Sequence, residues 1–206
     1  GSCEYFETGF SLSINGPGQR MEVSPISIGS AYSLGSWVKF PLPEPADGHN
    51  VLFMGENPVS YHLAIHSISR EIGIYQTNTD GDYYDWWLSG FNVEQLNGWH
   101  FLSVVAENST TNFYVDGSEV GNSNFVVSTP ILRIGNTTPN YNNGTQYIGI
   151  IDEPAIWNNA LTQEDFQSHM LSGLMGNESG LVAYWNLNEG SGNSANDVSG
   201  NGHTGT

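Results

Sequence analysis

The sequence predicts an all-β protein, a two-sheet antiparallel β-sandwich with one short helix near residues 162–172. Three observations support this fold class. Short runs of alternating apolar and polar residues recur between Gly, Pro and Asn residues, which is typical of strands joined by turns. A chain of 206 residues is long enough to bury one sizeable core, and we expect a single domain over residues 1–206. One segment has both a start and a stop signal for a helix.

Ten segments show the strand pattern. In residues 61–66, Tyr61, Leu63 and Ile65 are expected on one face of the strand and the even-numbered side chains on the other. In residues 101–105 both faces carry apolar side chains, so this strand is expected at the centre of a sheet. The Asp-Gly pair within YVDGSEVG predicts a tight hairpin turn. In chain order the segments are FSLSI, YSLGSWVKF, NVLFMG, YHLAIHSI, IGIYQT, WHFLSVVA, TNFYVDG, PILRIGN, YIGIIDEPAIW and GLVAYWNL.

The helix signal lies between residues 161 and 173. Thr162 is a suitable N-cap, and Asp165 completes a capping-box pattern with it. Leu161 and Phe166 flank this cap as a hydrophobic staple, and Gly173 is a natural stop. We therefore expect a helix of about three turns.

The charge of the chain excludes some classes of partner. Asp and Glu outnumber Lys and Arg by 21 to 4, giving a formal net charge of −17. So few cations cannot neutralise a row of phosphates, and we expect binding neither to nucleic acid nor to an anionic membrane. There is no run of about 18 apolar residues for a membrane span. The single cysteine, Cys3, allows no intramolecular disulfide. A composition rich in Asn, Ser, Thr and Gly and poor in Lys favours a secreted or cell-surface, extracellular protein.

Four motifs in a fixed order resemble a known family. They are SLGSWVKF, GWHFLSVVAENSTTNFYVDGSEVG, LRIGN and IGIIDEPAIWNNALTQEDF. Together they resemble the laminin-G-like jelly-roll domains of the concanavalin A-like lectin/glucanase superfamily, including its pentraxin relatives, over most of residues 9–190. The resemblance implies a jelly-roll sandwich and, in many members, a structural calcium ion.

The end of the chain resembles a recurring segment of the same proteins. In many bacterial members, a segment like GLVAYWNLNEGSGNSANDVSGNGHTG opens a jelly roll, whereas here it closes the chain. Residues 181–187 alternate as a sheet strand would. Residues 188–206 are either a tail of this domain or the start of a following repeat.

The motifs for catalysis are missing. A retaining glycosidase needs two carboxylates about 5 Å apart on one face. The adjacent Asp152 and Glu153 would point to opposite faces of a strand. His62, His66 and Tyr61 match only part of the pattern of polysaccharide lyases, and no nucleophile elbow, phosphate loop or zinc spacing is present. We therefore expect no enzymatic activity.

Two sets of acidic residues are candidates for calcium binding. Asp80, Asp82 and Asp85 supply hard oxygen ligands in a glycine-containing loop, although a solvated acidic turn explains them equally well. The resemblance to the family adds Asp152, together with Asp197 and Asn201 in the closing segment.

The same acidic loop is rich in aromatic residues. Along a strand Tyr83, Asp85 and Trp87 would share one face, and the opposite face, with Leu88, is the better candidate for the core. An exposed aromatic ring beside a carboxylate is the chemistry of sugar recognition, because the ring stacks on C–H faces and the carboxylate accepts bonds from hydroxyls. The alternative is that both indoles pack under loops. A second loop offers the same chemistry through Tyr141, Asn142 and Asn143.

The sequence thus predicts a noncatalytic, calcium-stabilised carbohydrate-binding module of a larger secreted or cell-surface protein. Neutral polysaccharides or glycans are favoured, because a strongly anionic domain repels uronates and sulfates unless calcium bridges them. An adhesion module that binds protein is the alternative, and a glycoside hydrolase or polysaccharide lyase is the third choice. A spacer without a ligand is the fourth.

Overall fold

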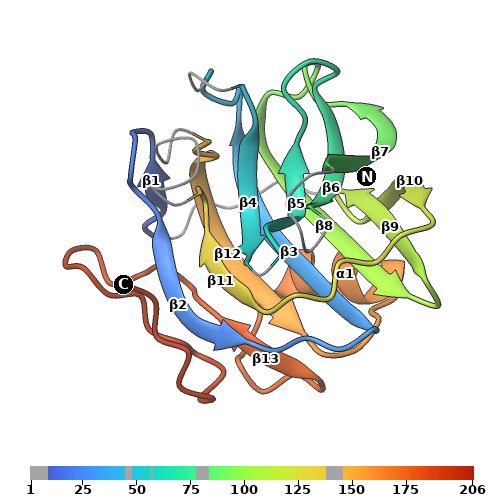
Figure 1. Cartoon of the computed structure of the whole chain (residues 1–206). Coiled ribbons are helices and arrows are strands. Elements are labelled where there is room, and N and C mark those ends of the chain that lie inside the picture. The colour runs from blue at the N-terminus through green and yellow to red at the C-terminus, as the bar shows by residue number, and fades with distance from the viewer. Residues whose placement is uncertain (1–8, 45–47, 57, 78–83, 138–145) are drawn as a thin grey trace.

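The protein is a β-sandwich of two antiparallel sheets. The computed structural model describes residues 9–44, 48–56, 58–77, 84–137 and 146–206. In the described residues one sheet has seven strands and the other six, and a single helix lies outside them (Figure 1). The predicted fold class is confirmed. None of the described helical residues forms a segment long and apolar enough to cross a membrane.

The strands of each sheet come from distant parts of the chain. The seven-stranded sheet has the order β1 (Leu12–Ile14), β12 (Gly149–Trp157), β3 (Tyr32–Phe40), β8 (Gly98–Glu107), β9 (Thr110–Val115) and β10 (Ser118–Ser123), with β13 (Leu181–Tyr184) also paired to β12. The six-stranded sheet has the order β2 (Met21–Ile26), β11 (Ile131–Ile134), β4 (Asn50–Gly55), β5 (Ser60–Ile65), β6 (Glu71–Thr77) and β7 (Tyr84–Asn92).

The main hydrophobic core lies between the two sheets. Leu34 and Val104 of the seven-stranded sheet pack in one cluster with Leu63 and Ile74 of the six-stranded sheet, and all four are fully buried. Burial of each such side chain stabilises the fold by about 1.5–3 kcal/mol. Strand β8 is central, as predicted, because Val105 on its other face belongs to a second cluster.

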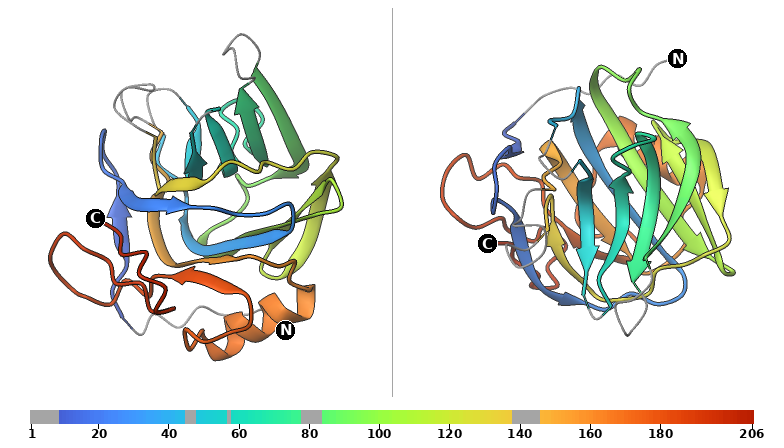
Figure 2. Two further views of the ribbon diagram at one scale, coloured as in Figure 1. Left: turned by 60° about the horizontal axis from the view of Figure 1, so that its bottom comes forward. Right: turned by 45° about the horizontal axis from the view of Figure 1, so that its top comes forward.

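Helix α1 (Gln163–Ser172) covers the outer face of the seven-stranded sheet. The predicted capping box is present, since Thr162 accepts a bond from the Asp165 amide and the Asp165 carboxylate accepts one from the Thr162 amide. Phe166 is fully buried against β8, β9 and β12, and Leu161 packs in the same cluster. Gly173 ends the helix at φ 71°. The left view of Figure 2 shows the helix on the side of the sandwich away from β4–β7.

A polar group is enclosed inside the core. His62 on β5 is fully buried, with one ring nitrogen 3.4 Å from the Tyr32 hydroxyl and the other 3.0 Å from the Thr129 hydroxyl. Burial lowers the pKa of His62 from 6.5 to about 3, so the ring is neutral at ordinary pH. The two bonds satisfy both nitrogens of a side chain that would otherwise be costly to bury.

Residues 188–206 pack onto this sandwich. Ala195 pairs with Gly205, and the backbone of Thr206 exchanges two hydrogen bonds with Glu22 on β2, at 2.8 and 2.9 Å. The buried Trp185 donates its indole N–H to the carbonyl of His203 at 2.8 Å. The tail, red in Figure 1, therefore contacts strands at both ends of the chain.

Bulges break the alternation along β4 and β5. The register of their pairing shifts between Val51 and Phe53 and again between Phe53 and Met54. As a result Tyr61 lies with Ala64 on the outer face of the sheet, whereas Leu63 packs in the main core. The prediction that Tyr61 shares a face with Leu63 and Ile65 is wrong, because a bulge adds a residue that simple alternation does not count.

Candidate functional site

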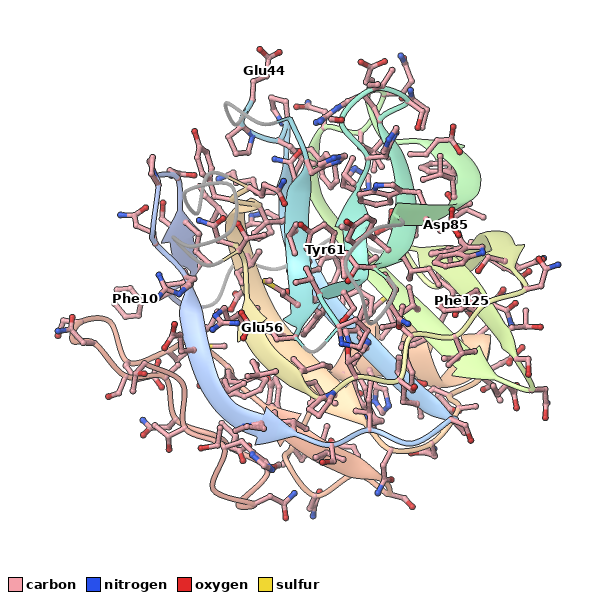
Figure 3. All side chains as sticks on the ribbon, in the orientation of Figure 1. Phe10, Glu44, Glu56, Tyr61, Asp85 and Phe125 are labelled. Atoms are coloured by element: carbon pink, nitrogen blue, oxygen red, sulfur yellow. The ribbon has the colours of Figure 1, made fainter. Side chains whose placement is uncertain are left out.

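The outer face of the six-stranded sheet is the face opposite the helix. Its side chains form a separate cluster from strands β4, β5, β6 and β7, distinct from the main core and from the cluster under the helix. Val51, Met54, Tyr61 and Tyr75 are buried in this cluster, and Trp86 is only partly buried. Figure 3 shows Tyr61 lying over the sheet on the side toward the viewer. We call this set, with His49 and His66, the aromatic face.

Trp86 is the centre of the aromatic face. Its ring stacks on that of His49 with centroids 4.8 Å apart at 27°, and it meets the His66 ring edge-on at 5.0 Å. Tyr75 and Tyr61 lie beneath it, with centroids at 5.2 and 5.8 Å. Because five rings fix one another, the indole is a rigid, partly exposed platform.

The two histidines are held by the backbone of the β5–β6 turn. His49 Nδ1 accepts a bond from the Ser67 amide at 3.0 Å. His66 Nδ1 accepts one from the Ser69 amide at 3.3 Å and is 3.1 Å from the Ser69 hydroxyl. An acceptor at Nδ1 assigns the proton of a neutral imidazole to Nε2. Burial lowers the pKa of His66, against the opposing effect of the Glu71 carboxylate, so the neutral ring is favoured.

A pocket of about 520 Å³ adjoins the same turn. Arg70 lines it and donates from Nη1 to the Gly48 carbonyl at 3.2 Å. Glu44 and Glu94 are exposed at its rim, and Figure 3 shows Glu44 projecting from the end of the sandwich. Its volume is in the usual range of ligand pockets, about 300–1,000 Å³. The other lining residues are Phe40, Pro41, Leu42, Gly48, Ser67, Val93 and Leu96.

The two tryptophans of β7 face opposite sides of the sheet, as predicted, but Trp86 and not Trp87 is on the outer face. Trp87 lies opposite Ile74 and packs against the main core, where its ring stacks on Phe125 at 3.7 Å. Trp86 lies opposite Tyr75 on the outer face. The expectation that Trp87 is the outward ring is wrong, because the neighbouring strand fixes which side of β7 meets the core.

The remaining predicted ligand-binding residues divide into two groups. Asp85 is exposed at the start of β7, opposite Gln76, and Figure 3 shows it at the edge of the sheet. Four predicted residues lie outside the described part of the chain: Tyr83, Tyr141, Asn142 and Asn143.

The predicted metal ligands lie only partly within the described residues. Asp80 and Asp82 lie outside the described residues. Asp152 is buried on β12, and its Oδ1 accepts a bond from the Glu153 amide at 2.9 Å. Within the residues that the structure describes, no three His, Cys, Asp or Glu side chains are placed to share a metal ion.

Asp197 and Asn201 organise the tail. The carboxylate of Asp197 accepts bonds from the amides of Tyr184, Ser199 and His203, at 3.1, 2.9 and 2.9 Å. These donors and the Ser199 hydroxyl lower the pKa of Asp197 although burial opposes them. Asn201 donates to the carbonyls of Leu181 and Val182. Both side chains are therefore engaged in joining the tail to β13.

Glu153 is on the helix side of the sandwich. Its carboxylate bonds with the side chains of Tyr184 and Trp37, and burial raises its pKa. The Asp152 Oδ1 accepts a bond from the backbone amide of Glu153. The two neighbouring carboxylates thus have separate structural partners.

Two residues of the candidate site, His49 and Arg70, cannot be recognised from a local sequence motif. His49 is 37 positions from Trp86, and only the topology of the sheet brings them together. Arg70 likewise has no local motif. The one available signal was the position of His49 in a loop rich in Pro and Gly beside a strand.

Comparison with solved structures shows the same fold. A candidate carbohydrate binding protein from Bacteroides ovatus ATCC 8483 has a TM-score of 0.66 at 17% identity, over 95% of this chain and 58% of that one. Domain 4 of AbnA, a GH43 extracellular arabinanase from Geobacillus stearothermophilus in complex with arabinotriose, has a TM-score of 0.57 at 20% identity, over 80% and 78%. The Ruminococcus gnavus IT-sialidase CBM40 bound to alpha2,3 sialyllactose has a TM-score of 0.57 at 13% identity, over 82% and 100%.

This chain therefore spans 58% of the Bacteroides protein. No curated protein sequence matches it. The family model described as the concanavalin A-like lectin/glucanases superfamily, Laminin_G_3, matches residues 15–167. The match covers most of the sandwich, and the chain belongs to this laminin-G-like family.

Proposed function

We propose that the protein is a noncatalytic carbohydrate-binding module whose binding surface is the aromatic face. The observation on which the proposal rests is the partly exposed Trp86 ring, which stacks on His49 and contacts the two buried tyrosines. The exposed part of this indole, together with the His49 ring stacked on it, offers a fixed apolar surface to the C–H groups of a pyranose or furanose ring.

The groups around Trp86 suit the hydroxyls of a sugar. His66 has its Nδ1 engaged with Ser69, which leaves Nε2–H to donate. The pocket beside the β5–β6 turn adds carboxylates that accept from hydroxyls and a guanidinium that donates. The structural neighbours give further support, since two of them hold arabinotriose and sialyllactose.

The module would act by concentrating a larger protein at a glycan surface. The AbnA neighbour is one domain of an extracellular arabinanase, and the Bacteroides neighbour is longer than this chain. Tethering to a multidomain partner raises the effective concentration of that partner at the polysaccharide, so weak binding by each module suffices. We propose the same secreted, multidomain setting for this chain.

Hydrolysis is the second candidate, because Glu44 and Glu94 line one pocket. Both are exposed at the rim. A carboxyl that acts as a general acid is commonly held in an apolar, buried environment, so this exposure favours hydroxyl binding. The absence of new reducing ends after incubation with bound polysaccharides supports the noncatalytic proposal, and their appearance refutes it.

The test is calorimetric titration with a panel of oligosaccharides, using Trp86→Ala and a matched control. Removing a central aromatic contact costs about 2 kcal/mol or more, which is about a 30-fold loss of affinity. Trp99→Ala is the control, because Trp99 is also partly buried but packs against the cluster on the helix side. Equal binding by both variants refutes the aromatic face as the site. Adhesion to protein is favoured instead if Trp86→Ala loses binding to a protein partner and excess soluble sugar does not compete with that partner for the wild type.

A further inference from the structure

We propose that Arg70 binds a sugar carboxylate, so that the module prefers acidic glycans. The inference rests on the proposed function and names the ligand class of the same site. The carboxylate belongs either to a uronate within a polysaccharide or to a terminal sialic acid. The two share the chemistry that a guanidinium recognises.

Arg70 differs from the other arginines in having no carboxylate partner. Arg20 lies 2.6 Å from Glu22, and Arg133 lies 2.7 Å from Glu56. Within the described part of the chain, no carboxylate oxygen lies within 4.0 Å of the Arg70 guanidinium. A cation without a carboxylate partner is unexpected in a chain of net charge −17 that has only four Lys and Arg residues.

The Arg70 guanidinium has N–H donors that are not used in the hydrogen bond to Gly48. Arginine has five N–H donors in a planar fork, and Arg70 uses Nη1 to hold the Gly48 carbonyl at 3.2 Å. A carboxylate matches this fork with two parallel hydrogen bonds, which a sugar hydroxyl cannot do. The geometry therefore favours a carboxylate over a neutral hydroxyl at this position.

The backbone of Arg70 is fixed before any ligand arrives. Its amide donates to the His66 carbonyl at 3.0 Å, and its carbonyl accepts from the Val93 amide at 2.9 Å. Its φ of 55° lies in the left-handed region, which is uncommon for residues other than glycine. Such conformations persist where the surrounding structure holds them, and they are frequent at ligand sites.

The rest of the pocket fits the other parts of a sugar. Val93, Leu96 and Phe40 provide apolar walls for ring C–H groups. Glu44 and Glu94 are exposed at the rim and accept from hydroxyls, whereas Arg70 is partly buried. The Gly48–His49 step joins the pocket to the aromatic face, since Gly48 contacts Arg70 and His49 stacks on Trp86.

The overall negative charge does not prevent this contact. Exposed charges farther apart than about 8 Å are largely screened at physiological ionic strength, so the distant acidic residues contribute little at the pocket. A partly buried, bidentate pair is screened far less. The nearby Glu44 and Glu94 oppose the acidic ligand, and their removal should therefore strengthen its binding.

The experiment is calorimetric titration with two matched pairs of ligands. One pair is an oligouronate and the same oligosaccharide after reduction of its carboxyl groups, and the other is sialyllactose and lactose. The variants are Arg70→Gln, Arg70→Lys and Glu94→Gln, with Arg20→Gln as the control for loss of one positive charge. The Tm of each variant shows that it is folded.

We expect the wild type to bind one acidic ligand about 10-fold or more tighter than its neutral counterpart. Arg70→Gln should abolish the preference, so that each acidic ligand binds no more tightly than its neutral counterpart. Arg70→Lys should retain part of the preference, and Glu94→Gln should increase it. Whichever pair shows the preference identifies the source of the carboxylate.

Three results overturn the inference. Binding of neutral sugars that depends on Trp86, without any preference for acid, refutes the role of Arg70 but leaves the proposed function standing. A preference for acid that persists in Arg70→Gln does the same. No binding of any of the four ligands by the folded wild type, or by the wider panel, refutes both.

Discussion

Replacement of His62 by glutamine should remove a large part of the acid sensitivity of the fold. His62 is enclosed between Tyr32 and Thr129, and burial lowers its pKa from 6.5 to about 3. In the unfolded chain the ring binds a proton below pH 6.5, whereas in the folded protein it stays neutral down to pH about 3. The unfolded state therefore gains protons first, and stability falls with pH across this window.

The size of the effect follows from the two pKa values. Above pH 6.5 the ring is neutral in both states and contributes no pH dependence. Below that pH each unit costs about 1.4 kcal/mol, so His62 alone destabilises the protein by about 2–3 kcal/mol between pH 7 and pH 4.5. The glutamine side chain in the His62→Gln variant cannot take up a proton, and its amide can still bond to Thr129.

Urea unfolding of both proteins at pH 7 and pH 4.5 measures the difference. The acid-induced loss in free energy of unfolding should be about 2–3 kcal/mol larger in the wild type, whatever the substitution costs at pH 7. All other groups titrate in both proteins and cancel in the comparison. Equal losses, within about 0.5 kcal/mol, refute the assignment of His62 as a buried neutral ring.

Three further changes test the helix, the tail and calcium. Phe166→Ala should lower the free energy of unfolding by about 3–5 kcal/mol, because Phe166 is fully buried, whereas Leu171→Ala on the exposed side should change it by less than about 0.5 kcal/mol in the same urea assay. Asp197→Ala should free three backbone amides and make residues 188–206 sensitive to limited proteolysis; unchanged digestion would contradict its role. If Asp80 and Asp82 bind calcium, the ion at about 100 times its Kd should stabilise the protein by about 2.7 kcal/mol, and a Tm unaffected by EDTA would rule this out.

Much of the fold could be predicted because its signals are local. The capping box of Thr162 and Asp165 and the turn at Asp116 and Gly117 each depend on residues within a few positions of one another. Alternation predicted the strands for a similar reason. It failed for Tyr61, since a bulge shifts the register of β5 in a way that the sequence does not mark.

The site was harder to predict because it depends on which strands become neighbours. Alternation showed that Trp86 and Trp87 point in opposite directions, but only the pairing with Ile74 and Tyr75 decides which ring meets the core. The meeting of His49 with Trp86 is a contact between a loop and a strand distant in the chain. Local pattern therefore shows that the two indoles of β7 face opposite ways, but it does not show which residues meet on the outer face.

The backbone pairing of Thr206 with Glu22 also bears on how the protein avoids aggregation. Strand β2 is the last strand of its sheet, and an uncovered edge offers N–H and C=O groups to the edge of another molecule. Gly205 and Thr206 occupy part of that edge. Removal of these two residues would expose a template for intermolecular strand pairing, so a chain shortened by two residues should self-associate more strongly than the chain that retains them.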